Sequence, residues 1–237
     1  MANLSQKNVK SAMILAAGRG ERMRPLTDRV PKPLLMVGDK PLVEHHILRL
    51  INAGFDHIVL NTAHLGEQIE ACLGDGSRFG IDIDYSREGQ GQALETGGGI
   101  YKALDLLRGE VFAVINGDVW SDFDLGRLNL NPLFNQKDLA AHLVMVKNPE
   151  HNTAGDFCLV KGRVAVDGCN ERLTFSGMSL FHRDFFKKAK GGAFPLAPML
   201  RDAMGQKQVS GELHDGLWVD VGTPERLEMV NNMLEAN

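Results

Sequence analysis

The chain has 237 residues, of which 43% are apolar, and a formal net charge of −4 at pH 7. A chain of this size buries roughly 70 to 75% of the surface that its unfolded state exposes, which is enough for one well-packed core. The acidic balance argues against a general nucleic-acid or membrane-surface binder. No apolar run approaches the roughly 20 residues that a bilayer-spanning helix needs. We therefore expect one domain, residues 1–237, with neither nucleic acid nor a membrane as a partner.

The three cysteines, Cys72, Cys158 and Cys169, are odd in number and lack the spacing of metal ligands. The residues before the first apolar run lack the hydrophobicity of a signal peptide. Both observations predict a cytoplasmic protein with free thiols.

Apolar runs and amphipathic segments alternate along the first half of the chain. Strands are predicted at 11–16, 57–61, 81–85 and 111–115, and helices at 42–53, 66–73 and 98–107. Such alternation indicates βαβ units and a mainly parallel sheet flanked by helices. In the second half, strands in hairpins are predicted at 139–147, 157–160, 163–166 and 173–181, and helices at 195–204 and 224–235. The fold class is therefore α/β, with a mixed, Rossmann-like sheet and inserted antiparallel strands.

The run 15–33 joins a flexible turn to several cationic side chains directly after the first strand. Gly18 and Gly20 allow positive φ angles and close backbone approach, so that exposed N–H groups can surround phosphate oxygens. Arg22, Arg24 and Lys32 can neutralise several negative charges. A surface turn with solvated charges is the alternative, but the preceding strand, the small Ala16 and Ala17, and the two prolines around Lys32 favour a phosphate-binding loop.

Two carboxylates follow predicted strands. Asp118 lies in the Asn116-Gly117-Asp118 turn after strand 111–115, and Asp220 lies at a second strand-to-helix junction. The alternative interpretation of the Asn116-Gly117-Asp118 segment is an ordinary turn without a metal. Because the carboxyl ends of parallel strands meet at one edge of a sheet, Asp118 faces the phosphate loop. Mg²⁺ prefers one or two carboxylates together with phosphate oxygens and water, so a carboxylate at such a strand end can reach this ion.

Three consecutive glycines at 97–99 weaken a plain helix start, so they predict close approach to a flat group, for which a nucleobase fits. The segment before them offers three candidates for contact with the base edge. These are Glu88, Gln90 and Gln92, and the sequence leaves the choice open.

The run 15–33 resembles, almost letter for letter, the signature of the sugar-1-phosphate nucleotidyltransferases: Leu-Ala-Ala-Gly-x-Gly-x-Arg, then Pro-Leu-Thr, then Pro-Lys. The resemblance implies a GT-A-like fold, a Mg²⁺ ion on Asp118 and Asp220, and base contacts at Thr96 and Gly98. It further implies that Arg22 binds the β- and γ-phosphates and that Lys32 binds the two reacting phosphates, so both are the expected catalytic residues. The expected nucleotide-binding residues are Leu15, Ala16, Ala17, Gly18, Gly20, Glu21, Arg22, Lys32, Thr96, Gly98 and Asn116.

Motifs in the second half of the chain narrow the resemblance to one group of enzymes within this family. The chain lacks the Glu-Lys-Pro motif of many glucose and mannose enzymes, and its Gly155-Asp-Phe and Leu173-Thr-Phe-Ser-Gly motifs resemble those of the N-acetylmuramate-1-phosphate uridylyltransferases. This implies UTP and N-acetylmuramate 1-phosphate as substrates and a role in peptidoglycan recycling. It also implies a nucleotide-binding part at 10–138 and a sugar-binding part at 139–237, after a flexible segment at 1–9. The expected sugar-binding residues are Gly155, Asp156, Glu171, Ser176 and Gly177.

Alternative functions remain open at this stage. The sugar could be glucose, mannose or N-acetylglucosamine. A glycosyltransferase would use an Asp-x-Asp motif such as Asp122-Phe-Asp124, and a non-catalytic sensor would bind a nucleotide sugar without turnover. No hexapeptide-repeat domain follows residue 224, so acetyl transfer and the trimer that such a domain imposes are not expected, and a monomer is preferred.

Overall fold

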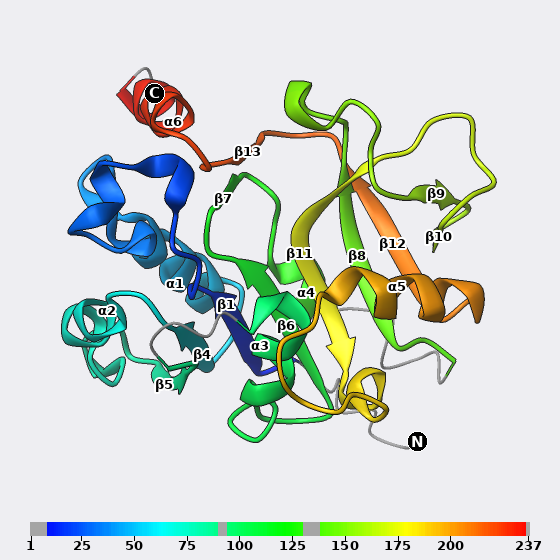
Figure 1. The fold of residues 1–237 in the computed structure, drawn as a ribbon, viewed down its shortest axis with the longest axis horizontal. Helices are drawn as coiled ribbons and strands as arrows, with labels where there is room; N and C mark the ends of the chain where they lie inside the picture. Colours follow the sequence, from blue (N-terminus) through cyan, green and yellow to red (C-terminus); the bar gives the residue numbers. More distant parts are fainter. Residues whose placement is uncertain (1–8, 90–93, 130–137, 236–237) are drawn as a thin grey trace, which may run out of the picture.

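A computed structural model describes residues 9–89, 94–129 and 138–235, and a large mixed sheet forms its centre (Figure 1). The order of its nine strands is β5-β4-β1-β6-β11-β8-β12-β10-β9. Their bounds are β1 Ser11–Leu15, β4 His57–Thr62, β5 Asp82–Arg87, β6 Val111–Asn116, β8 Ala141–Val146, β9 Cys158–Val160, β10 Arg163–Ala165, β11 Thr174–His182 and β12 Val209–His214.

Strand direction divides the sheet into two parts. Strands β5, β4, β1 and β6 are parallel to one another, so that their carboxyl ends lie at one edge. Strand β11 is antiparallel to both β6 and β8, and β12 is parallel to β8. Because β11 runs against β6, the start of β11 lies beside the end of β6. The two parts of the sheet therefore meet at the edge where the phosphate loop begins.

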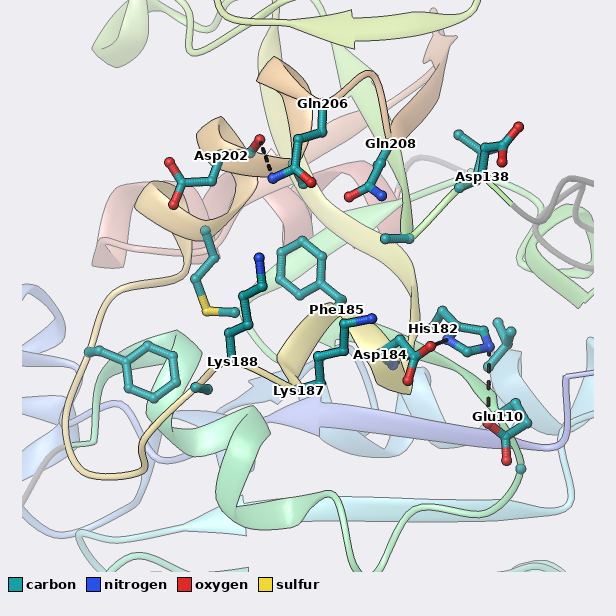
Figure 2. A pocket seen from close by; sticks show the side chains of 18 of the residues that line it. Glu110, Asp138, His182, Asp184, Phe185, Lys187, Lys188, Asp202, Gln206 and Gln208 are labelled. Atoms are coloured by element: carbon teal, nitrogen blue, oxygen red, sulfur yellow. Dashed lines mark hydrogen bonds and ion pairs between the residues drawn. The ribbon is translucent and has the colours of Figure 1, made fainter.

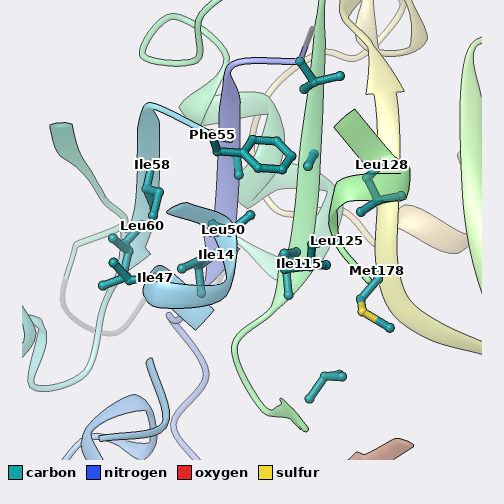
Figure 3. Packing of buried hydrophobic residues seen from close by; sticks show 14 of the residues in the cluster. Ile14, Ile47, Leu50, Phe55, Ile58, Leu60, Ile115, Leu125, Leu128 and Met178 are labelled. Atoms are coloured by element: carbon teal, nitrogen blue, oxygen red, sulfur yellow. The ribbon is translucent and has the colours of Figure 1, made fainter. Parts of the chain in front are cut away.

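Helices cover both faces of the sheet. On one face, α1 (Leu42–Asn52), α2 (Gly66–Leu73) and α4 (Gly126–Asn129) contribute to an apolar cluster that also contains Ala12 and Ile14 of β1. Figure 3 shows Ile14 with Ile47 and Leu50 of α1 and Leu128 of α4 in this cluster. On the other face, α3 (Glu95–Ala103) and α5 (Leu196–Gly205) share a second cluster with Met13 of the same strand. This alternation along β1 is the pattern of a strand that is buried on both faces.

Two small sheets and the last helix complete the edge above the carboxyl ends. Strand β7 (Val119–Ser121) pairs with β13 (Trp218–Asp220), and β2 (Met36–Val37) pairs with β3 (Lys40–Pro41). Helix α6 (Pro224–Glu235) packs against them through Val230, which joins Val37 and Val221 in a third apolar cluster. The segment that carries Asp220 is thereby held beside the end of β6.

The sequence-based elements of the first half are largely confirmed, since each predicted strand is present within two residues of its expected ends. The helices at 66–73 and 224–235 are present as predicted. The helix predicted at 98–107 begins at Glu95 and ends at Ala103. Strand β12 was missed, and β8 and β11 are not a simple hairpin, because the β9–β10 hairpin lies between them in the chain.

Two expectations are corrected by the structure. Val9 is buried in the core, so the segment predicted to be flexible does not include it, and residues 1–8 lie outside the described residues. Cys158 and Cys169 form a disulfide between β9 and the segment after β10, and only Cys72 of the three is free. None of the described helices is long and apolar enough to cross a membrane.

Candidate active site

A cavity of about 470 Å³ lies at the carboxyl ends of β1, β4 and β6. Most residues predicted to bind the nucleotide line it: Leu15, Ala16, Ala17, Gly18, Gly20, Glu21, Arg22, Lys32, Thr96 and Asn116. Asp118 lines it as well. Three further lining residues were not predicted as site residues, and these are Asn61, Glu95 and Gly222. Pro33, one of the two prolines around Lys32, and Gly117, in the turn before Asp118, also line the cavity. Glu88, one of the three open candidates for the base edge, is also part of the lining, whereas Gln90 and Gln92 lie outside the described residues.

The phosphate loop folds back on itself at Gly20. Gly20 has a φ of 64°, and a Cβ there would lie 2.9 Å from the methyl carbon of Thr27 and 3.2 Å from the Cβ of Lys32. The Thr27 hydroxyl donates to the Gly20 carbonyl oxygen at 2.8 Å. Gly18 differs, because its φ is not positive and a Cβ there would meet no atom within 4 Å. The open space at Gly18 faces the cavity, so its backbone is free to approach a ligand.

Lys32 and Asp118 form an ion pair in the cavity wall. The distance between Lys32 Nζ and Asp118 Oδ2 is 2.6 Å, and the two side chains are 11% and 31% exposed. Arg24, by contrast, is paired with Asp28 and does not line the cavity. Of the predicted loop cations, Lys32 and Arg22 are therefore the two that the structure brings to the site.

Asp220 lies next to Asp118 through the pairing of β7 with β13. The Val221 N–H donates to the Asp118 carbonyl oxygen at 2.6 Å. Asp220 Oδ1 accepts from Arg226 Nη1 at 2.5 Å, and His151 Nε2 lies 3.1 Å from the same oxygen. Asp220 itself does not line the cavity, but the neighbouring Gly222 does.

A divalent cation fits this pair of carboxylates by its donor set. Among the described residues, no group of three or more His, Cys, Asp and Glu side chains gathers to hold a metal by itself. Two carboxylates at one edge, each balanced by a cationic side chain, suit an ion that takes its remaining oxygen ligands from phosphates and water. Arg22 Nη2 lies 3.0 Å and Asp220 Oδ2 3.2 Å from the position of a Cβ on Gly222, so both groups converge on this backbone.

The three glycines of α3 pack against the protein itself. Gly98 donates its N–H to the Phe194 carbonyl oxygen at 3.1 Å, and a Cβ on Gly98 would overlap the Gly192 carbonyl oxygen. A Cβ on Gly97 would lie 2.5 Å from the Phe194 ring. Gly98 does not line the cavity, whereas Thr96 does. Close packing of α3 against 191–194 therefore accounts for Gly97 and Gly98, and a Cβ on Gly99 would lie 2.6 Å from Glu88 Oε1.

The expected sugar-binding residues lie outside the cavity lining, at different distances from it. Gly177 has a φ of 81°, and a Cβ there would lie 2.6 Å from the side-chain nitrogen of Asn116, so it borders the site. Ser176 accepts a hydrogen bond from the Trp218 ring N–H at its carbonyl oxygen, at 2.9 Å. Asp156 accepts from the Phe175 N–H at 2.8 Å and holds the start of β11. Gly155 has a φ of 62° and packs on Arg172, and Glu171 is exposed.

Known proteins resemble this chain in both sequence and fold. A sequence model of the nucleotidyl transferase family matches residues 11–163. The chain belongs to this family. It is 52% identical to N-acetylmuramate α-1-phosphate uridylyltransferase of Neisseria meningitidis serogroup B, over 92% of this chain and 95% of that protein. It is 32% identical to the enzyme of the same name from Caulobacter vibrioides, over 91% and 93%.

Solved structures agree on the fold. A Bacillus anthracis structure, provisionally assigned as a glucose-1-phosphate thymidylyltransferase in complex with a sucrose, has a TM-score of 0.82 and 22% identity. The alignment covers 94% of that chain and 95% of this chain. The predicted GT-A-like α/β fold of a nucleotidyl transferase is thus confirmed.

His46 is buried beneath the Gly117 turn of this nucleotidyl transferase, at 2% exposure. Burial, together with the charge of Arg49, lowers the pKa of His46 to about 4, against the opposing effect of Asp118. The imidazole is therefore neutral at physiological pH. His45 binds the Val37 carbonyl oxygen at 2.8 Å and packs edge-on against Trp120.

The alternative metal motif does not reach the active site. Asp122 pairs with His214 at 2.8 Å, and Asp124 accepts from the Gly126 N–H at 2.9 Å. Neither carboxylate lines the cavity that holds Lys32. The Asp-x-Asp motif at 122–124 is therefore part of a turn of this fold.

A second and larger cavity, of about 1530 Å³, lies at the opposite edge of the sheet (Figure 2). Val111 at the start of β6 and His182 at the end of β11 both line it. Its charged groups are mixed, with His182 between Glu110 at 4.0 Å and Asp184 at 3.9 Å, and with Lys187 and Lys188 nearby (Figure 2). The smaller cavity is lined by the predicted phosphate loop and by Asp118, with Asp220 on the strand beside Asp118, and it is therefore the candidate active site.

Proposed function

We propose that this nucleotidyl transferase transfers UMP from UTP to N-acetylmuramate 1-phosphate, giving UDP-N-acetylmuramate and pyrophosphate. The observation that carries the proposal is the 52% identity to the Neisseria meningitidis enzyme over nearly the whole of both chains. The site supports it, because the predicted phosphate loop, Lys32 and Asp118 line one cavity, and Asp220 lies on the strand beside Asp118.

The reaction requires two polyanions to meet. An oxygen of the sugar phosphate attacks the α-phosphorus of UTP, and the bond to the β-phosphate oxygen breaks with pyrophosphate as the leaving group. The attacking oxygen is already ionised at neutral pH, so no general base is needed, and positioning and charge neutralisation provide most of the catalysis. This agrees with a site whose charged groups include Arg22, Lys32 and two carboxylates rather than a triad.

Each residue then has a defined task. Lys32, held at 11% exposure, offers a fixed positive charge to the reacting phosphates. Arg22 extends its exposed guanidinium toward Gly222 and is placed to bind the β- and γ-phosphates. Asp118 and Asp220 would hold Mg²⁺, which when bound supplies positive charge to the phosphate oxygens. Small residues at 16–18 leave room for the nucleoside.

The sugar is the finer part of the proposal. A lactyl ether adds bulk and a carboxylate, and a site that binds a polar group rejects an analogue that lacks it more strongly than it rejects a missing methylene. Gly177 borders the cavity, since a Cβ there would lie 2.6 Å from the side-chain nitrogen of Asn116, and this position supports a role on the sugar side. We further propose that the enzyme works in the cytoplasm in peptidoglycan recycling, because its product is a nucleotide-activated cell-wall sugar.

Pyrophosphate release from UTP tests the function. The protein is incubated with UTP, Mg²⁺ and one of four sugar 1-phosphates: N-acetylmuramate, N-acetylglucosamine, glucose or mannose. We expect kcat/KM for N-acetylmuramate 1-phosphate to exceed that for N-acetylglucosamine 1-phosphate at least about tenfold. Equal rates, or a faster reaction with glucose or mannose 1-phosphate, would contradict the proposed sugar. Such a result would still support nucleotidyl transfer as the reaction type. Release of UDP from a UDP-sugar would indicate a glycosyltransferase. Binding of a nucleotide sugar without turnover would indicate a non-catalytic sensor.

A further inference from the structure

Two buried polar side chains, Asn61 and Glu88, face each other in the wall of the active-site cavity. Asn61, in β4, is 4% exposed, and Glu88, just after β5, is 5% exposed. The Asn61 side-chain N–H donates to Glu88 Oε1 at 2.6 Å. Both residues line the cavity beside the phosphate loop. Buried polar groups of this kind are maintained only where their hydrogen bonds are satisfied.

The remaining bonds of this pair reach two different segments of the site. Asn61 Oδ1 accepts from the Ala16 N–H, at the start of the phosphate loop, at 2.7 Å. Glu88 Oε2 accepts from the Leu94 N–H, at the start of α3, at 3.1 Å. A continuous chain of hydrogen bonds therefore runs from the phosphate loop through two buried side chains to the helix that presents Thr96.

The start of α3 needs such support. Glu95 follows Leu94, has a φ of 56° and lines the cavity. A residue other than glycine in this left-handed region costs of order 1–3 kcal/mol and persists where its surroundings hold it. Both backbone groups of Leu94 are held, since its carbonyl oxygen also accepts from the Phe194 N–H at 3.1 Å.

The polarity of the chain is fixed at both ends. Ala16 and Leu94 both present backbone N–H groups, which only donate, so each needs an acceptor. Asn61 must therefore point its oxygen at Ala16 and its N–H at Glu88, and both Glu88 oxygens are then accepting. The Glu88 carboxylate is thus engaged within the protein rather than aimed at a base edge.

We propose that Asn61 and Glu88 are a pair of positioning residues that sets the phosphate loop and the start of α3 at the spacing a nucleoside triphosphate requires. The pair acts through Ala16 and Leu94 and makes no contact with the nucleotide. This inference rests on the proposed nucleotidyl transfer and deepens it, because it assigns a role to two residues outside the family's phosphate-binding run.

A reciprocal exchange tests the pair. In Glu88→Gln, every orientation of the amides leaves one donor facing another donor. In Asn61→Asp, two carboxylates face each other. In the double variant, the new carboxylate at position 61 accepts from the Ala16 N–H and from the new amide at position 88, and the oxygen of that amide accepts from the Leu94 N–H. The double variant therefore restores every hydrogen bond and the net charge, and only the position of the carboxylate moves.

We expect each single variant to weaken nucleotide binding, measured by calorimetry without sugar, by at least about tenfold, the effect of one buried group left without a partner. Binding and kcat/KM should return to within about threefold of wild type in the double variant, because all of the hydrogen bonds are again made. Asn129→Asp is the matched control. Its side-chain N–H donates to the Ala53 carbonyl oxygen at 2.8 Å, away from the cavity, so the substitution should lower the melting temperature and leave nucleotide binding unchanged.

Two results would overturn the proposal that Asn61 and Glu88 position the site. Single variants that bind like wild type would show that the hydrogen-bond chain does not set the site. A double variant as weak as Glu88→Gln would show that a carboxylate is needed at position 88, as in direct contact with the base. The measurements use whichever of the four common nucleoside triphosphates the wild type binds most tightly. The wild-type assay alone then judges the proposed function, and the ratio of variant to wild type judges the pair.

Discussion

Lys32 is the residue at which charge and burial combine most directly. Its ammonium group is mostly enclosed and lies 2.6 Å from Asp118. A fixed charge beside the reacting phosphate stabilises the transition state more than the ground state. We expect Lys32→Met, which keeps an apolar stem, to lower kcat by on the order of 10²-fold or more, measured by pyrophosphate release under saturating substrates.

Arg24→Met is the control for Lys32→Met, because Arg24 is a loop cation that is paired with Asp28 and lies outside the cavity. It should retain the wild-type kcat. If Lys32→Met raises only the KM for UTP, Lys32 binds substrate but does not act in the transition state.

The two proposed metal ligands, Asp118 and Asp220, give a second prediction at the scale of single residues. Asp118→Ala and Asp220→Ala should each abolish turnover while leaving the circular dichroism spectrum unchanged, because each removes a proposed metal ligand at a strand end. Asp122→Ala should keep its turnover, since Asp122 pairs with His214 outside the cavity. Near wild-type rates in either of the first two variants, at saturating Mg²⁺, would remove that carboxylate from the metal site.

Single residues were predictable where the signal is local in sequence. The phosphate loop is one continuous run, so its lining residues from Leu15 to Lys32 were identified from the family signature that the run resembles. Asn61 was missed, because its role comes from hydrogen bonds to residues far along the chain. The roles of Asp156 and Gly98 are likewise set by partners in other elements, Phe175 and Phe194.

At the scale of elements, helix α3 shows why a glycine pattern has two interpretations. The glycines at 97–99 predicted a nearby base, and the structure shows close packing of Gly97 and Gly98 against 191–194 and of Gly99 against Glu88. Strands of the first half were predictable, because apolar runs between amphipathic segments dominate there. Strand β12 was missed, because Ser210, Gly211 and Glu212 interrupt its apolar residues and its parallel pairing with β8 depends on the rest of the sheet.

The two kinds of glycine give a paired prediction. Gly98→Ala should destabilise the fold by about 1–3 kcal/mol, as overpacking does, because its Cβ would overlap the Gly192 carbonyl oxygen. The melting temperature should fall by about 2–4 °C for each kcal/mol. Gly18→Ala, with no neighbour within 4 Å, should keep the melting temperature and raise the KM for UTP. The opposite pattern in thermal and kinetic measurements would contradict these assignments.

At the scale of the whole molecule, one sheet joins the predicted nucleotide-binding and sugar-binding parts. Antiparallel pairing of β6 with β11 places Asn116 next to Gly177, and β13 places Asp220 next to the turn after β6. Pairing between distant strands is set by the packing of all of them together, so the sequence indicated the fold class but not this order. The site is complete only where these segments meet.

The disulfide is a whole-molecule feature because it changes the stability of the chain through its unfolded state. Cys158 and Cys169 are separated by 11 residues, and closing a loop of this size stabilises a protein by up to about 3 kcal/mol. We expect Cys169→Ser to lower the free energy of unfolding by that amount under oxidising conditions, measured by urea denaturation. A reducing agent should lower the wild type to the same value and leave the variant unchanged. Cys72→Ser, which alters the free cysteine, should behave like the wild type with and without reductant. Equal midpoints for the wild type in both conditions would show that the two thiols are unpaired in solution, as their number and spacing in the sequence predicted.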